Sequence, residues 1–186
     1  MAREVEQFRQ QFEQMSLDAD ALAGPLSDEQ FTWQPTPGAW SVALCIEHLN
    51  TTARLYLPQL DEAIANAIRR GTYGEGPFSY NVFGRFFTGA MEPPPRFRMT
   101  TPSQFQPPLV RPRAEVMAAF RAYQVQFVDR LRQANGLDLA RAKVRSPVYS
   151  WMRFSLGSGF ALMLAHERRH LWQARNVVAL PGFPKK

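Results

Sequence analysis

The sequence has little cysteine, histidine or lysine and no long apolar run. One cysteine, Cys45, occurs among 186 residues, which excludes an internal disulfide and indicates a reducing compartment. No uncharged apolar run approaches the about 20 residues that a membrane span needs, so we expect no membrane partner. Residues 1–6 are mostly polar and do not resemble the start of a signal peptide. Together these absences predict a cytoplasmic protein.

The composition predicts one globular domain with a basic surface. The chain is long enough to bury a core, and we expect a single domain that covers residues 1–186. The formal net charge is +6 and the sequence pI is about 10.0. The arginines are spread along the chain, which predicts a solvated surface with no nucleic-acid partner. A modest gathering comprises Arg85, Arg96, Arg98, Arg111 and Arg113.

Four stretches have the spacing of apolar residues that is typical of amphipathic helices. The second stretch begins after Ser41, an expected N-cap, and Pro58 either kinks this helix or ends its first part. The last stretch begins near Ser155 or Ser158 and ends before Pro181. The expected helices cover residues 2–23, 41–70, 112–134 and about 155–180.

A long connection, residues 71–112, separates the second helix from the third and is rich in glycine, proline and aromatic residues. A connection of this length is uncommon in a compact domain and is usually either functional or poorly ordered. Its aromatic residues indicate that much of the connection packs against the rest of the protein. No segment has the clean alternation of a strand. The sequence therefore predicts an all-α fold, a four-helix bundle with long irregular loops between helices two and three and short extra helices in those loops.

The three histidines of the chain are placed as a metal site requires. His166 and His170 are four residues apart in the last helix, so their imidazoles point the same way. His48 lies in a different apolar helix. Neutral imidazole is a common ligand for zinc, copper, iron and nickel, and three histidines with open coordination positions are typical of a reactive site. The alternative is that the pair in the last helix is an ordinary one on an exposed or half-buried face.

Two known metal signatures overlap these residues and do not fit. His166-Glu167-x-x-His170 matches the H-E-x-x-H pattern of zinc metallopeptidases, but no His, Asp or Glu follows His170 to supply the third ligand. A di-iron carboxylate bundle needs glutamates three residues before the histidines, where Cys45 and Met163 stand. Both classes are therefore excluded.

Two neighbours of the histidines are weaker candidates for the site. Glu167 follows an expected ligand and points about 100° away from it round the helix. We expect it to make a contact at the surface, or a contact to one of the metal ligands, in preference to acting as a general base. Cys45 lies one turn before His48, where it could be a fourth ligand or a redox thiol. A lone cysteine more often simply packs in the core.

Two blocks near opposite ends of the chain carry a family resemblance. The blocks are Trp33-x-Pro35 with Pro37-Gly38-Ala39-Trp40-Ser41-Val42 and His48-Leu49, and His166-Glu167-Arg168-Arg169-His170-Leu171-Trp172-Gln173. The first resembles the W-x-P, P-G-x-W-S and H-L pattern that leads into the second helix of the DinB-like superfamily, also called the YfiT-like metalloprotein superfamily. The second resembles the H-x-x-x-H-x-x-Q pattern of that family's final helix. Residues 60–150 contribute little to the resemblance.

The resemblance implies a four-helix bundle with a divalent metal ion, commonly nickel or zinc, held by His48, His166 and His170 and completed by waters. It also implies a homodimer. The best understood family members are thiol-dependent transferases or isomerases that use a low-molecular-weight thiol such as bacillithiol, mycothiol or glutathione, and others are described as metal-dependent hydrolases. No catalytic residue of the family can be matched in this sequence.

The leading hypothesis is a metal-dependent enzyme of the thiol-dependent S-transferase or isomerase type that acts on a small-molecule substrate. The ion would lower the pKa of a bound thiol, and residues 71–112 would close over the site and hold an anionic thiol. One alternative is a hydrolase that uses metal-activated water. The other is a non-catalytic protein, either a metal-binding stress protein or a basic nucleic-acid binder, although no nucleic-acid-binding motif occurs.

Overall fold

The computed structural model describes residues 1–80, 82–95, 100–107, 111–149 and 151–185. This part of the chain is mostly helical and contains one small two-stranded antiparallel sheet. The helices are α1 (Arg3–Ala23), α2 (Asp28–Thr32), α3 (Val42–Arg69), α4 (Val82–Met91), α5 (Arg113–Ala134) and α6 (Leu156–Val178). A 3-10 helix covers Ser103–Phe105, and the strands are β1 (Lys143–Arg145) and β2 (Arg153–Ser155).

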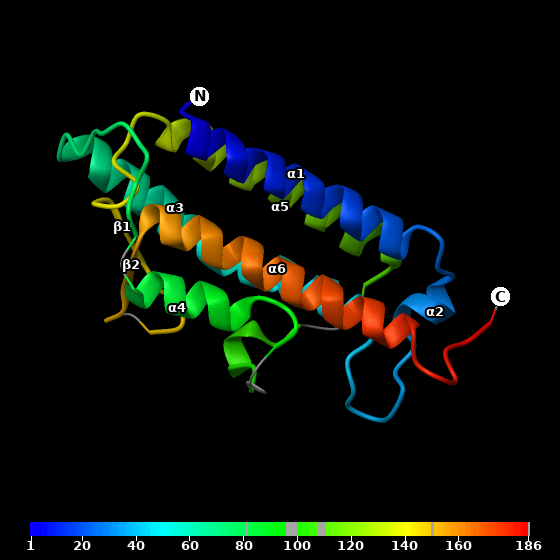
Figure 1. Cartoon of the computed structure of the whole chain (residues 1–186). Coiled ribbons are helices and arrows are strands. Elements are labelled where there is room, and N and C mark those ends of the chain that lie inside the picture. The colour runs from blue at the N-terminus through cyan, green and yellow to red at the C-terminus, as the bar shows by residue number, and fades with distance from the viewer. Residues whose placement is uncertain (81, 96–99, 108–110, 150, 186) are drawn as a thin grey trace.

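The four long helices α1, α3, α5 and α6 lie side by side with their axes roughly aligned (Figure 1). α3 packs against α5 and α6, and α1 packs against the same two helices. Phe12 of α1 stacks on Phe127 of α5, with ring centroids 4.8 Å apart, and meets the ring of Phe160 of α6 edge-on. α3 and α6, the two helices that carry the histidines, therefore lie against each other within this four-helix packing.

Serine side chains fix where α3 and α6 begin. The Ser41 hydroxyl accepts a hydrogen bond from the Leu44 amide, which confirms the predicted N-cap. The Ser155 hydroxyl accepts one from the Ser158 amide, so of the two expected starting points the structure has Ser155. α3 continues through Pro58 as one helix, because its other backbone hydrogen bonds and its packing on α5 and α6 compensate for one missing donor.

The small sheet is the element that the sequence did not predict. β1 and β2 pair antiparallel, with Val144 opposite Phe154. These two side chains are buried, whereas Lys143, Arg145 and Arg153 are exposed. Each strand is three residues long, which is too short for an alternating pattern to be recognised. The prediction of a mostly helical chain is confirmed, and the expectation of no strand is wrong.

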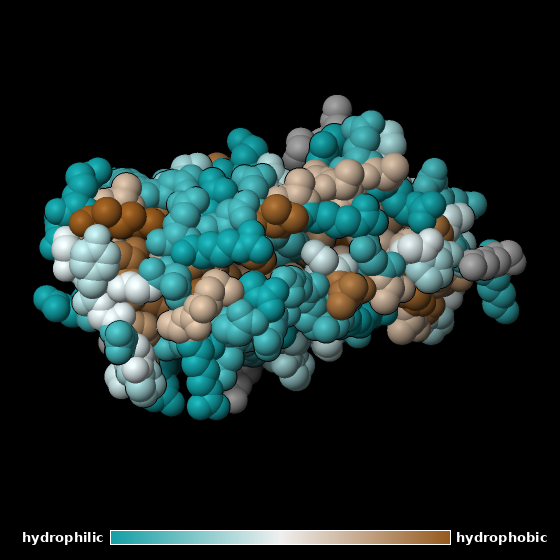
Figure 2. Space-filling view, turned by 90° about the horizontal axis from the view of Figure 1, so that it is seen from above, coloured by the Kyte–Doolittle hydropathy of each residue, from teal (hydrophilic) through white to brown (hydrophobic). Residues whose placement is uncertain are grey.

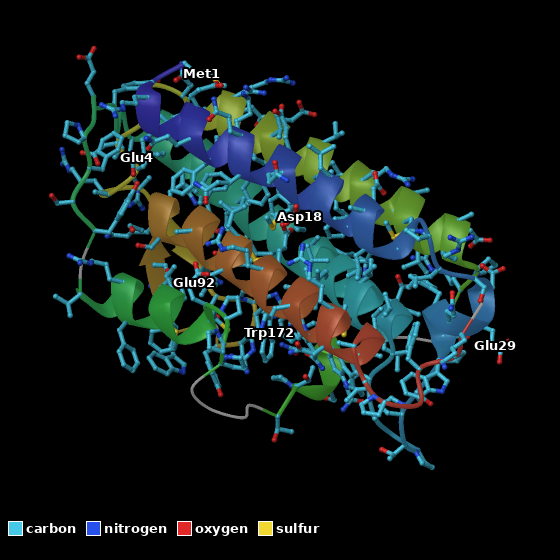
Figure 3. All side chains as sticks on the ribbon, turned by 45° about the vertical axis from the view of Figure 1, so that its right-hand side comes forward. Met1, Glu4, Asp18, Glu29, Glu92 and Trp172 are labelled. Atoms are coloured by element: carbon cyan, nitrogen blue, oxygen red, sulfur yellow. The ribbon has the colours of Figure 1, made fainter. Side chains whose placement is uncertain are left out.

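The long connection between α3 and α5 contains α4 and the 3-10 helix, as predicted for extra helices in this region. α4 packs along α6 (Figure 1). Glu92, which follows α4, lies beside α6 (Figure 3). It forms an ion pair with Arg168 of α6. Earlier in the connection, the Tyr80 hydroxyl donates a hydrogen bond to Glu4 of α1. A Cβ atom at Gly157 would overlap the Tyr80 hydroxyl oxygen, so glycine permits this close approach to the start of α6.

The molecular surface is mainly hydrophilic on the face shown in Figure 2, where hydrophobic residues form small, separate patches. Several large apolar side chains of the protein are well exposed. They include Val82 and Phe86 of α4 and Tyr149 and Trp151 of the turn between β1 and β2. Among the helices of the described residues, none has the length and apolar character needed to cross a membrane.

Candidate metal centre

α3 and α6 bring the three histidines to one place. His48 lies on the second turn of α3, and His166 and His170 lie on consecutive turns of α6. Because α3 packs against α6, the side chains converge even though 118 positions separate His48 from His166. One ring nitrogen from each histidine can be chosen so that all three lie within 4.8 Å of one another. The cluster therefore consists of the three residues that the sequence singled out.

The spacing of the ring nitrogens suits a metal ion. His48 Nε2 and His166 Nε2 are 3.1 Å apart. The ring centroid of His170 lies 4.4 Å from that of His48 and 4.6 Å from that of His166. Two nitrogens at about 2.1 Å from one ion, with an angle between a right angle and a tetrahedral one, are about 3.0–3.4 Å apart. The observed distance between His48 Nε2 and His166 Nε2 falls in this range, so these two imidazoles are spaced as ligands of one ion, and His170 offers a ring nitrogen within 4.8 Å of both.

The backbone carbonyl of Phe105 fixes the orientation of His48. His48 Nδ1 donates a hydrogen bond to this oxygen over 2.7 Å. With the proton on Nδ1, the lone pair of Nε2 is directed toward His166. A hydrogen bond of this kind, from the ring nitrogen that does not bind the metal, is usual for metal-binding histidines. The 3-10 helix of the long connection thus takes part in the cluster, which no sequence pattern predicted because the acceptor is a main-chain atom.

Burial keeps the three imidazoles neutral. His48 and His170 are buried and His166 is partly buried. Loss of water lowers the pKa of His170 to about 3, and the nearby His48 and Arg169 add to this effect. The same loss of water is the main reason that the pKa values of His48 and His166 are lowered. Neutral imidazole is the form that binds metal ions.

Two buried nitrogens of the cluster lack partners. Nδ1 of His166 and Nδ1 of His170 form no hydrogen bond within the described residues. Burying a polar atom without a partner is costly. A bound ion or water that engages these rings would relieve part of this cost.

Trp40 lies directly against the histidine cluster. Its ring stacks on the His170 ring, with centroids 5.5 Å apart and planes at 22°, and meets His48 edge-on at 5.1 Å. The indole therefore covers one side of the cluster and restrains two of its rings. The sequence contained a signal for this role, because Trp40 is the tryptophan of the P-G-x-W-S block.

Cys45 is not part of the cluster. Its side chain is buried in the apolar core, and burial raises the pKa of its thiol. Among the described residues, the group of His, Cys, Asp and Glu side chains that could hold an ion contains only His48, His166 and His170. Of the alternatives raised for Cys45, the structure favours simple packing.

Glu167 points toward α5 and is buried, not exposed. Its carboxylate accepts a hydrogen bond from Gln124 Nε2 over 2.9 Å, and only 1% of the residue is exposed. Burial raises the pKa of Glu167 to about 8. Of the two contacts expected for Glu167, burial excludes the surface one. The contact observed is a buried one between helices, and Gln124 is a partner that no sequence pattern indicated.

Among the described residues, the arginines gathered in the middle of the chain do not form one cluster. Arg111 donates two hydrogen bonds, of 2.7 and 3.0 Å, to Glu47, a buried carboxylate next to His48 in the sequence. Arg113 pairs with Asp28 at the start of α2, and Arg85 is exposed on α4. Two further members, Arg96 and Arg98, lie outside the described residues, as do residues 81 and 108–110 of the same connection.

The comparisons with known proteins identify the family. No curated protein and no solved structure gives a significant match to this chain. The sequence pattern of the DinB superfamily, by contrast, matches residues 11–174. The matched region covers most of the chain and includes Trp40, Glu167 and all three histidines. The chain belongs to the DinB superfamily.

Proposed function

We propose that His48, His166 and His170 bind one divalent metal ion, nickel or zinc, and that the protein is a metal-dependent enzyme acting on a small molecule. The observation that carries this proposal is the convergence of three neutral imidazoles, two of them with Nε2 atoms 3.1 Å apart. Three protein ligands leave open coordination positions, which favours a reactive site over a closed structural one. Membership of the DinB superfamily supports the proposal.

The side chains around the cluster have separate tasks in this proposal. When bound, a divalent ion lowers the pKa of a thiol or water that coordinates it. The three imidazoles hold the ion, and the Phe105 carbonyl keeps His48 in the tautomer that binds through Nε2. Trp40 covers one side of the site and limits access of water. His166 is the least buried of the three histidines, so we expect substrate to approach from its side.

Within this class we favour a thiol-dependent S-transferase or isomerase that uses a low-molecular-weight thiol. Arg169 lies on α6 between His166 and His170 in the sequence, and its guanidinium donates a hydrogen bond to the Ala90 carbonyl of α4. A guanidinium in this position attracts an anionic group such as the carboxylate of a small thiol. The alternative hydrolase lacks support for Glu167 as its general base, because Glu167 faces Gln124 and lies outside the cluster.

Metal content tests the first part of the proposal. Protein purified without a histidine tag is analysed by elemental mass spectrometry, beside His170→Ala and, as a control, Cys45→Ala. We expect about one nickel or zinc ion per chain in the wild type and in Cys45→Ala, and loss of the ion in His170→Ala. A wild-type protein that stays empty after incubation with nickel, zinc and manganese contradicts the metal site.

Dependence on added thiol tests the reaction class. The metal-loaded protein is assayed with electrophilic small molecules and bacillithiol, mycothiol or glutathione, and separately with ester and amide substrates in the absence of thiol. Turnover that requires thiol and is lost in His48→Ala supports the transferase or isomerase. Turnover without thiol supports the hydrolase, and stable metal binding with neither activity supports a non-catalytic metal-binding stress protein.

We further propose that the four long helices form the bundle typical of the family and that the protein is a cytoplasmic homodimer. Exposed apolar side chains on α4 and on the neighbouring turn, Phe86 and Trp151 among them, support an interface with a second copy. Light scattering coupled to size-exclusion chromatography should give twice the chain mass of 21.2 kDa. Phe86→Ser combined with Trp151→Ser should shift it to the monomer, and a wild-type monomer would contradict the dimer.

A further inference from the structure

A basic pocket lies at the other end of α3 from the histidine cluster. It has a volume of about 580 Å³ and is lined by the last turns of α3 and by the chain around β1 and β2. Gln59 and Arg70, which bound its α3 side, lie 11 and 22 positions beyond His48. At about 1.5 Å per residue along a helix, this places the pocket roughly 16–33 Å from the cluster. The pocket is therefore a separate feature of the molecule.

Small residues on α3 and before β1 create the hollow. Ala63 and Ala67 lie one turn apart on α3, and Ala142 precedes β1. All three are buried, so they form an apolar floor, while the charged side chains around them are exposed. A hollow of about 300–1,000 Å³ is the usual size of a small-molecule site, and this pocket falls within that range.

The pocket has a strong excess of positive charge. Its lining contains one carboxylate, that of Glu62, and five cations, namely Arg70, Arg141, Lys143, Arg145 and Arg153. Within the described residues, none of these five forms an ion pair, and Lys143 donates only to the Ala140 carbonyl. Elsewhere, eight arginines pair with carboxylates: Arg9, Arg111, Arg113, Arg121, Arg130, Arg132, Arg168 and Arg175. Within the described residues, Arg3, Arg54 and Arg85 also form no ion pair and lie outside the pocket, so what distinguishes the pocket is that five such cations gather around one hollow.

The arrangement of the pocket cations lowers the stability of the folded protein. Arg145 of β1 is directly opposite Arg153 of β2, and like charges at opposed positions of an antiparallel pair are destabilising. The negative end of the α3 dipole accounts for Arg70, which caps that helix. It does not account for the three arginines that follow in the chain. An external anion would compensate for these charges.

We propose that this basic pocket binds a small molecule carrying two or more phosphate groups. Arginine offers paired donors that match phosphate oxygens, and several arginines around one hollow favour clustered negative charge. The alanine floor contacts the apolar part of the ligand. The proposal does not rest on the metal site, because the residues of the two sites do not overlap.

Calorimetric titration with inorganic pyrophosphate tests the pocket directly. We expect saturable binding to the wild type at 50 mM salt that weakens as salt is raised. Arg145→Gln with Arg153→Gln should weaken it at least tenfold, and Arg70→Gln with Arg141→Gln should do the same from another side of the pocket. Arg3→Gln with Arg54→Gln, both exposed and outside the pocket, is matched in net charge and should change the affinity less than twofold.

Three further results separate binding in the pocket from binding elsewhere on the protein. Equal losses in the pocket pairs and the matched control would overturn the proposal, since general surface charge would then account for the affinity. Loss of pyrophosphate binding in His170→Ala would also overturn it, by placing the anion at the histidine cluster. Vesicles of phosphatidylglycerol distinguish a lipid headgroup from a soluble ligand. Binding of the protein to vesicles but not to pyrophosphate would overturn the proposal of a soluble phosphate ligand. Thermal melts should show that all variants remain folded, because the replaced side chains are exposed, and Arg145→Gln with Arg153→Gln should melt no lower than the wild type because it removes an opposed pair of like charges.

Discussion

His48 uses its two ring nitrogens for different contacts, and this distinguishes it from the other two histidines. Nδ1 is held by the Phe105 carbonyl and Nε2 faces His166. His170 has no such support at Nδ1 within the described residues, and is instead restrained by the face of Trp40. One main-chain oxygen and one indole ring therefore help to hold the imidazoles of the cluster in place.

Replacing Trp40 by leucine should weaken metal binding without removing a ligand. Loss of a group that supports a metal ligand commonly reduces affinity 10- to 100-fold, and we expect about tenfold here because the imidazole rings remain. The measurement is competition for the ion with a chelating dye. The control is Trp33→Leu, because Trp33 packs on Phe183 and not on the histidines. Equal affinities for the two variants would show that Trp40 does not position the cluster.

Glu167 should prove to be a structural residue. In Glu167→Gln the new amide oxygen can still accept from Gln124, so we expect the free energy of unfolding to stay within about 1 kcal/mol of the wild type. Glu167→Ala leaves a cavity and a buried amide without its partner, which should cost about 2–4 kcal/mol. Urea denaturation measures both. Loss of activity in Glu167→Gln with unchanged metal content and stability would instead reveal a general base.

At the scale of elements, the contact between the long connection and α6 depends on Gly157. In Gly157→Ala the new Cβ would displace the Tyr80 ring and break its hydrogen bond to Glu4, so we expect a loss of about 1–3 kcal/mol in the free energy of unfolding. The control is Gly89→Ala in α4, where nothing lies within 4 Å of the new atom. The Gly157 effect should shrink in a Tyr80→Ala background, and an undiminished effect would place the strain elsewhere.

The long helices and the identities of the clustered histidines could be predicted from the sequence because each depends on local pattern. Apolar spacing located the four long helices, and the i, i+4 rule placed His166 and His170 on one face of α6. Ser41 followed from the chemistry of N-caps. Each of these features is decided by residues within a few positions of one another.

The remaining features depend on contacts between distant segments. The sheet consists of two three-residue strands whose pairing brings Val144 to Phe154, and neither strand has a pattern of its own. The burial of Glu167 depends on which face of α6 meets α5. The support from Phe105 comes from a carbonyl oxygen, which every residue possesses. Apolar spacing and side-chain motifs carry no information about these contacts.

For the whole molecule, a bound ion should stabilise the fold. The three histidines come from two helices that are far apart in the sequence, so the complete donor set forms only in the folded state. An ion at a free concentration of 100 times its dissociation constant adds about 2.7 kcal/mol to the free energy of unfolding. For a chain of this size, this corresponds to a rise in Tm of roughly 5–11 °C. Differential scanning calorimetry with and without chelator measures the rise. His170→Ala should show none, and an equal rise in this variant would assign the effect to ions bound elsewhere.

The hydrogen bond between His48 and Phe105 also joins the long connection to whatever the cluster holds. Coupling between two binding events is reciprocal, so an ion that is held better when the 3-10 helix is in place must stabilise that helix by the same factor. Binding of the ion would then favour the position of the 3-10 helix seen in the structure. Substitutions in the connection, far along the chain from every histidine, would then change the affinity for the ion. Relatives with identical ligands but different connections would bind their ions with different affinities.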